Sequence, residues 1–131
     1  MDQILHDKNN SCYDLEERTA KFSESVIDFI KNINRDAFND SSLRQLIRSA
    51  TSIGANYCEA NNASSKNDFR NKIYICKKEV NETKYWFRIL AKTNPELKEN
   101  LRPLWQEAQE LNLIFQKIVN SLNKKKEKFE N

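Results

Sequence analysis

Apolar residues recur at helical spacing in four segments of the chain. Within each segment, steps of three and four residues place the apolar side chains on one side of an α-helix and leave most charged side chains on the other. Pro103 lies inside the last segment, so that helix is expected to break or kink after a short piece that ends near Leu101. The pattern predicts four amphipathic helices, at residues 14–33, 42–60, 66–92 and 95–123.

Polar residues mark where two of these helices begin. Ser42 and Gln45 form a Ser-x-x-Gln capping box, in which each side chain pairs with a backbone amide of the first turn. Ser65 precedes Asp68 at the same spacing, and this carboxylate also suits the positive end of the helix dipole. Both motifs indicate that short polar turns separate the helices.

The short connections favour one architecture. Helices joined by short turns pack antiparallel to their neighbours, which predicts an all-α, up-down-up-down four-helix bundle over residues 13–123. Pro95 fits the first position of the last helix, with Asn94 as its cap. We expect residues 1–12 to be a flexible N-terminal segment and residues 124–131 to be a frayed basic tail.

Composition agrees with a single helical domain. The chain has 131 residues, 31% of them charged, and its one glycine and two prolines leave few turn residues for a many-stranded sheet. Cys12, Cys58 and Cys76 lack the paired spacing of a disulfide framework or a zinc site, so free thiols in a reducing compartment are expected. No apolar run has the length of a signal-peptide core or a membrane span, which predicts a cytoplasmic protein.

Candidate catalytic groups are sparse. Di-metal sites in helical bundles use Glu-x-x-His pairs, whereas the one histidine, His6, lies in the N-terminal segment. A metal site made of Glu59, Glu79 and Glu82 is the weaker alternative, because carboxylates on charged helices usually pair with Lys or Arg. Gly54 is the only glycine, which excludes a glycine-rich phosphate loop. We therefore expect no enzyme activity, no catalytic residue, no metal and no cofactor.

The helix predicted at residues 42–60 interleaves small and polar residues with apolar ones, so it can pack closely on more than one side. Its short polar side chains form a stripe opposite the predicted core, and the next helix carries a second face, with Trp86, away from its own core side. Arg48 is placed to pair with an acid of that second face. Ordinary surface is the alternative for both faces. The candidate oligomer-interface residues are Gln45, Arg48, Ser49, Ser52, Asn56, Glu59, Glu79, Glu82 and Trp86.

Cations concentrate in residues 66–92, which hold eight of them against three anions. Five step by four, seven, seven and four residues, a spacing that lines one strip of a helix. Such a strip can follow a nucleic-acid backbone, and a solvated lysine-rich face is the alternative. The candidate nucleic-acid-binding residues are Lys66, Arg70, Lys77, Lys84 and Arg88 of the strip, with Lys124, Lys125 and Lys126 of the tail.

Three stretches carry a family resemblance: Tyr13–Glu16, Gln45–Ala60, and the residues from Asp68 through Trp86. Through them the chain resembles a bacterial four-helix-bundle family, the 23S rRNA intervening-sequence proteins, some of which are encoded in intervening sequences of large-subunit ribosomal RNA genes. The accessory protein of diversity-generating retroelements is a more distant relative. The resemblance covers roughly residues 13–122 and implies a ring-like homopentamer without catalytic activity or cofactor. The retroelement relatives bind nucleic acid and a reverse transcriptase through a basic surface. The candidate partners implied here are therefore RNA or DNA and a partner protein, of which a reverse transcriptase is one example.

These observations predict a non-enzymatic, oligomeric accessory or scaffold protein whose basic surface binds RNA or DNA without sequence preference. The alternative is a homo-oligomeric interaction module that docks a partner protein through the Trp86 face or the polar stripe. In that case the charge serves solubility, and nucleic acid has no role.

Overall fold

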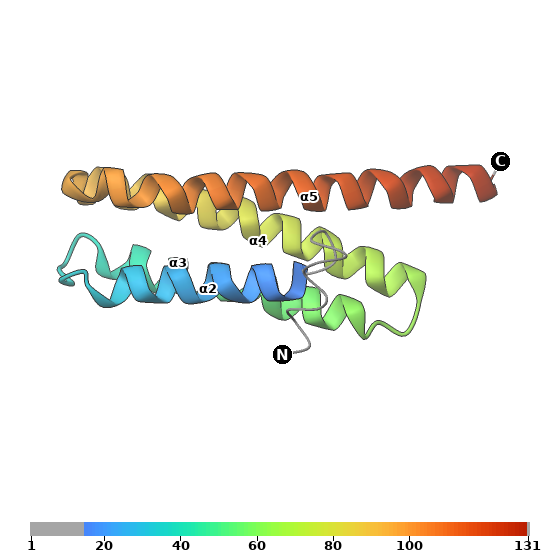
Figure 1. Cartoon of the computed structure of the whole chain (residues 1–131), viewed down its shortest axis with the longest axis horizontal. Coiled ribbons are helices and arrows are strands. Elements are labelled where there is room, and N and C mark those ends of the chain that lie inside the picture. The colour runs from blue at the N-terminus through green and yellow to red at the C-terminus, as the bar shows by residue number, and fades with distance from the viewer. Residues whose placement is uncertain (1–14, 131) are drawn as a thin grey trace.

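The structure, a computed structural model, describes residues 15–130, with side chains as far as residue 125. The residues expected to form the flexible N-terminal segment, 1–12, lie outside this part. The described chain is all-α, as predicted, and Figure 1 shows its four long helices running alternately in opposite directions. The elements are α2 (Leu15–Lys31), α3 (Asp40–Asn61), α4 (Lys66–Thr93), the 3-10 helix η2 (Pro95–Leu97) and α5 (Lys98–Glu130).

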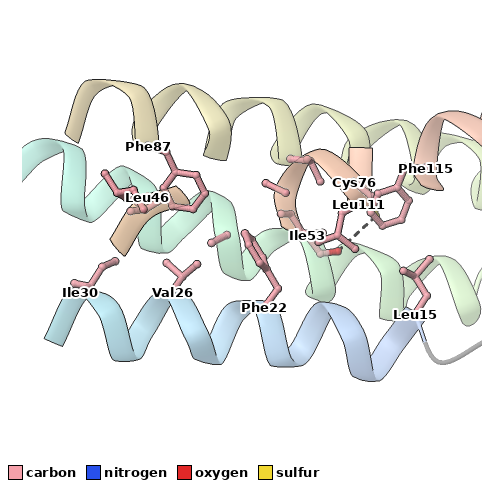
Figure 2. Close-up of a cluster of buried hydrophobic side chains, with 14 of the residues drawn as sticks. Leu15, Phe22, Val26, Ile30, Leu46, Ile53, Cys76, Phe87, Leu111 and Phe115 are labelled. Atoms are coloured by element: carbon pink, nitrogen blue, oxygen red, sulfur yellow. Dashed lines mark hydrogen bonds between the residues drawn. The ribbon is translucent and has the colours of Figure 1, made fainter. Parts of the chain in front are cut away.

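The helices enclose one apolar core. α3 packs against α2 and α4, α4 packs against α5, and α2 also touches α5. Figure 2 shows side chains of α2 pointing into the same interior that Phe87 of α4 and Phe115 of α5 fill. The rings of Phe22 and Phe87 meet edge to face, with centroids 6.4 Å apart. On the outside, Arg18 of α2 pairs with Glu107 of α5 at 2.8 Å, and this hydrogen bond raises the pKa of Arg18.

Hydrophobic spacing located most of the core. Alternating steps of four and three from Phe69 predict the inner side of α4, and Phe69 itself is half-buried. All the later positions of this row are buried: Ile73, Cys76, Val80, Thr83, Phe87 and Leu90. In α5 the same steps predict Ile118 and Leu122 on the inner side after Phe115, but Val119 is buried there and Ile118 and Leu122 are half-buried. The reason is that a straight helix drifts by about 20° per heptad relative to strict alternation of three and four. None of the helices among residues 15–130 combines the length and apolar character that crossing a membrane requires.

The predicted capping box of α3 does not form. α3 begins at Asp40, two residues before Ser42, which is buried inside the first turn. The residue that fixes this start is Asn39. Its side chain is fully buried and forms hydrogen bonds with residues of both turns at this end of the bundle. Its Oδ1 accepts from the backbone N–H of Asp36 at 2.9 Å, and its Nδ2 donates to Oδ1 of Asn94 at 3.2 Å. The tertiary contact between turns therefore overrides the local Ser-x-x-Gln motif.

The other predicted starts agree better with the structure. Ser65 is the N-cap of α4, and its Oγ accepts from the backbone N–H of Asp68 at 3.0 Å, as the motif predicts. Pro95 begins the 3-10 helix η2 directly after Asn94, although the Asn94 side chain makes no capping hydrogen bond there. The chain therefore turns from α4 into α5 through three residues of tighter helix.

The break expected near Pro103 is absent, because α5 continues through this residue. Proline removes the N–H that would pair with the carbonyl four residues earlier, which is that of Glu99. Both residues are exposed, so water can satisfy that carbonyl and the ring meets no packed neighbour. At the other end α5 extends to Glu130, which makes the predicted frayed tail part of the helix.

α3 packs closely against α2 on one side and against α4 on another, as its small residues predict. A Cβ atom on Gly54 would stand 3.2 Å from Oγ1 of Thr19 on α2, which is tighter than ordinary packing. Nearby, Ser23 of α2 donates to the backbone carbonyl of Ala50 at 3.2 Å. The side of α3 that faces α4 carries the buried Ser49.

We expect Gly54→Leu to destabilise the fold by about 1–3 kcal/mol, because the added side chain forces α2 away from α3. Urea unfolding followed by helical circular dichroism measures this loss. Ala55→Leu is the matched control, since Ala55 is exposed on the same helix. Equal stability of the two variants would contradict the close approach of α2 and α3.

Candidate nucleic-acid interface

The predicted basic strip of α4 follows the boundary between α4 and α5. From Lys66 to Arg88 it extends over roughly 33 Å at the helical rise of 1.5 Å per residue. α5 runs antiparallel to α4, so the end of α5 lies beside the start of α4, and the start of α5 lies beside its end (Figure 1). The two ends of the strip therefore have different surroundings.

At the start of α4, the strip is held by contacts with α5. Arg70 Nε donates to Oδ1 of Asn123 at 3.0 Å, and the guanidinium lies 5.3 Å from the centroid of the Tyr74 ring. Asn123 Nδ2 donates to the Tyr74 hydroxyl at 3.2 Å, and this bond, followed by the charges of Arg70 and Lys77, lowers the pKa of Tyr74. The bond to Asn123 also brings the adjacent, exposed Lys124 to this end of the strip. Lys125 is exposed too, and the side chain of Lys126 lies outside the described part.

At the end of α4, two strip residues face two cations of α5 across an open groove of about 600 Å³. None of the described residues that line this groove is acidic. Its floor includes the buried Phe87 and Leu101, and its sides include two aromatic residues that stay largely exposed. We call this the α4–α5 groove; its cations are Lys84, Arg88, Lys98 and Arg102, and its exposed aromatic residues are Tyr85 and Trp105.

The cations of the α4–α5 groove are held only by contacts that a ligand can replace. Lys84 Nζ lies 4.8 Å from the centroid of the Trp105 ring, a contact worth about 0.5–1 kcal/mol at an exposed site, and it also bonds to Gln109. Arg102 pairs with Glu99 at 2.9 Å, but both side chains are more than half exposed, so the pair is weak. Arg88 and Lys98 are exposed. An anionic ligand can therefore pair with these cations without breaking a strong contact.

Two predicted oligomer-interface residues are buried between helices of the bundle instead of lying on its outer surface. Ser49 is fully buried between α3 and α4, and its Oγ accepts from Thr83 at 2.9 Å. Glu79 is only 7% exposed and faces α3, where Arg48 pairs with it at 3.3 Å and also with Glu82. The prediction that Arg48 pairs with an acid of the next helix is confirmed. Within the predicted polar stripe, Ser49 was misplaced because it lies in the contact between α3 and α4.

The other predicted interface residues stay at least partly exposed on α3 and α4. Ser52 and Asn56 are half-buried and donate to carbonyls of their own helix, and Glu59 pairs with Lys72 at 2.8 Å. Trp86 is half-buried, and its indole N–H meets no acceptor among the described residues. Gln45 is half-buried beside Arg48. Their part in an oligomer interface stays a prediction, while all three candidate metal carboxylates, Glu59 among them, pair with cations.

The sequence comparison assigns the chain to a family. Residues 13–117, which include α2, α3, α4 and the part of α5 that lines the groove, match the family described as 23S rRNA-intervening sequence protein. The chain belongs to this family. The resemblance inferred from the sequence is thereby confirmed. No curated protein matches the chain.

A solved structure supports the same assignment. It is the crystal structure of a protein of unknown function from the S23 ribosomal protein family of Bacteroides thetaiotaomicron. It shares 31% sequence identity with this chain, with a TM-score of 0.69, and the match covers 79% of this chain and 96% of that chain. The similarity therefore extends over nearly the whole of the solved protein.

The sequence alone predicted the α4 side of the groove but not the α5 side. Lys98 and Arg102 were overlooked because the basic strip was sought on one helix alone, whereas the groove combines cations of α4 and α5. Tyr85 and Trp105 fall outside both the apolar core pattern and the cationic strip. The predicted antiparallel pairing of the last two helices already sets the first turns of α5 against the last turns of α4, so it could have pointed to these residues.

Proposed function

We propose that this protein binds the phosphate backbone of RNA or DNA, without sequence preference, through the α4–α5 groove. The observation that carries the proposal is the groove itself, which collects Lys84, Arg88, Lys98 and Arg102 and has no acid among its described lining residues. Clustered cations attract nucleic acid by releasing the counterions condensed on its phosphates. Because the contacts are to phosphates, they carry no direct information about base sequence.

The strip beyond the groove supplies further positive charge. Lys66 and Lys77 continue along α4, and Lys124 stands at the far end beside the Arg70–Asn123 bond. A backbone that leaves the groove along α4 therefore meets cations over the length of that helix. We propose that the protein acts as a non-enzymatic accessory or scaffold factor in this way, and that a homo-oligomer, for which a pentamer is our expectation, repeats the surface around a symmetry axis.

A salt titration of binding tests this function. We expect fluorescence anisotropy with short, labelled RNA and DNA to report binding that weakens steeply as salt rises. With about four phosphate contacts to a single strand, the affinity falls about 50-fold between 50 and 200 mM salt. Light scattering on a sizing column, run in parallel, measures the oligomer.

Two results of this titration would contradict the proposed function. If neither RNA nor DNA binds at low salt, the groove is not a nucleic-acid site, and docking of a partner protein becomes the leading hypothesis. Binding that persists unchanged at high salt would likewise exclude a phosphate-dominated contact, because exposed charges lose their attraction when screened.

A further inference from the structure

The α4–α5 groove offers more than positive charge. Tyr85 from α4 is 53% exposed and Trp105 from α5 is 41% exposed, so each presents much of an aromatic ring to solvent. Between them the floor is apolar, since Phe87, Ala91 and Leu101 line it. Phosphate groups pair with cations, but they gain no stabilisation from contact with an apolar floor or with the face of an aromatic ring. A ligand that fills the groove therefore needs both anionic groups and flat apolar groups.

We propose that the α4–α5 groove binds unpaired bases of single-stranded nucleic acid, which stack on Trp105 and Tyr85 while the adjoining phosphates pair with Arg88, Lys98 and Arg102. This inference rests on the proposed function, because it assumes that nucleic acid enters the groove. It adds the strandedness of the ligand and the part of the ligand that each side chain contacts.

Single strands fit this chemistry and duplexes do not. In a duplex each base covers the faces of its neighbours, so only base edges and the backbone are open to a protein. In a single strand the base faces are available, and proteins bind them by stacking on aromatic side chains beside a cationic track. A groove of about 600 Å³ is within the range of sites that enclose small organic groups, so a base has room between the two helices.

The contact between Lys84 and Trp105 shows how the groove can open to a base. The ammonium lies over the indole ring at 4.8 Å from its centroid, where it covers a surface that a base can stack on. Lys84 has a long, flexible side chain, so an arriving base can take its place while the ammonium moves to a phosphate. The positive charge therefore stays in the groove when the ring is uncovered.

Acidic peptides are the other anionic ligands to consider, and the groove suits them less. A peptide carries an N–H and a C=O at each residue that need partners when they are buried. Asn81 supplies the one side-chain amide among the described lining residues, and the cations cannot accept a hydrogen bond. The two faces of a base, by contrast, need no hydrogen-bond partner when they are buried.

The decisive experiment compares three probes of similar backbone charge on the wild-type protein and on Trp105→Ala. The probes are a short single-stranded RNA of mixed sequence, an abasic strand of equal length and a duplex, each measured by fluorescence anisotropy at one low salt concentration. We expect Trp105→Ala to weaken binding of the base-containing strand by about 5- to 150-fold, the equivalent of about 1–3 kcal/mol. Binding of the abasic strand and of the duplex should change less than about twofold, because their phosphate contacts remain.

Three further variants test whether single-strand binding depends on the aromatic rings of the groove. Trp105→Phe keeps an aromatic face and should retain most of the single-strand affinity, and Tyr85→Ala should show the same selectivity as Trp105→Ala. Leu113→Ala removes an exposed apolar side chain from α5 outside the groove and should leave all three affinities unchanged.

Two outcomes would overturn the base-stacking inference and leave the proposed function standing. One is equal affinity of the wild-type protein for the abasic and the base-containing strand. The other is a Trp105→Ala variant that binds all three probes as the wild type does, or loses affinity for all three by the same factor. Failure of the wild-type protein to bind any probe would overturn both the inference and the proposed function.

Discussion

Arg88→Glu combined with Arg102→Glu is expected to lower the affinity for short RNA by about 100-fold or more at low salt. Each change removes an attraction to phosphate and adds a repulsion, and the two residues stand on opposite sides of the α4–α5 groove. The fold should survive, because both side chains are exposed and substitutions at such sites usually change stability by less than about 0.5 kcal/mol. Anisotropy measures the affinity, and the slope of log affinity against log salt should fall by about 0.7 for each lost contact to a single strand.

A charge-matched variant controls for the change in net charge. Lys21→Glu with Lys31→Glu makes the same change at two exposed residues of α2, and no described residue of α2 lines the α4–α5 groove. We expect this variant to lose less than about tenfold in affinity, because its charges act only at long range through screening salt. Equal losses in the two variants would show that net charge, and not the groove, governs binding. Arg70 and Lys84 are less suitable for reversal, since both contact α5.

Phe115→Ala is expected to cost about 3–5 kcal/mol of stability, a large part of the 5–15 kcal/mol typical of a small domain. Phe115 is fully buried in the core (Figure 2). Its ring centroid lies 6.0 Å from that of Tyr57. Truncation removes the buried apolar surface and leaves a cavity that four packed helices can close only in part. Denaturant unfolding at a fixed protein concentration measures the loss, because oligomer formation would make stability depend on concentration.

Phe38→Ala provides the same chemical change at the surface. Phe38 is 81% exposed in the turn before α3, so its loss should change the unfolding free energy by less than about 0.5 kcal/mol. Similar losses in the two variants would contradict the placement of Phe115 in the core. A loss of less than 1 kcal/mol in Phe115→Ala would contradict it too.

The sequence by itself determined the helices and most of the core. Local spacing suffices for this, because three- and four-residue steps fix which side of a helix is apolar before any partner is known. The predicted apolar side of α4 from Ile73 to Leu90 is buried, and the Ser65 cap is present. The family resemblance, carried by the run from Gln45 to Ala60, was also readable from residues alone and is confirmed.

The tertiary structure decided which polar residues face inward and which cations share a groove. Ser49 and Glu79 read as surface residues, yet contacts with Thr83 and Arg48 bury them between α3 and α4. Periodicity separates apolar from polar sides but does not say which polar side meets a neighbouring helix, since that depends on the rotation of each helix in the bundle. The α4–α5 groove is a stronger case of the same limit. Its charge comes from two helices, and it exists only because the rotation of each helix in the bundle turns cations of α4 and of α5 toward the same groove.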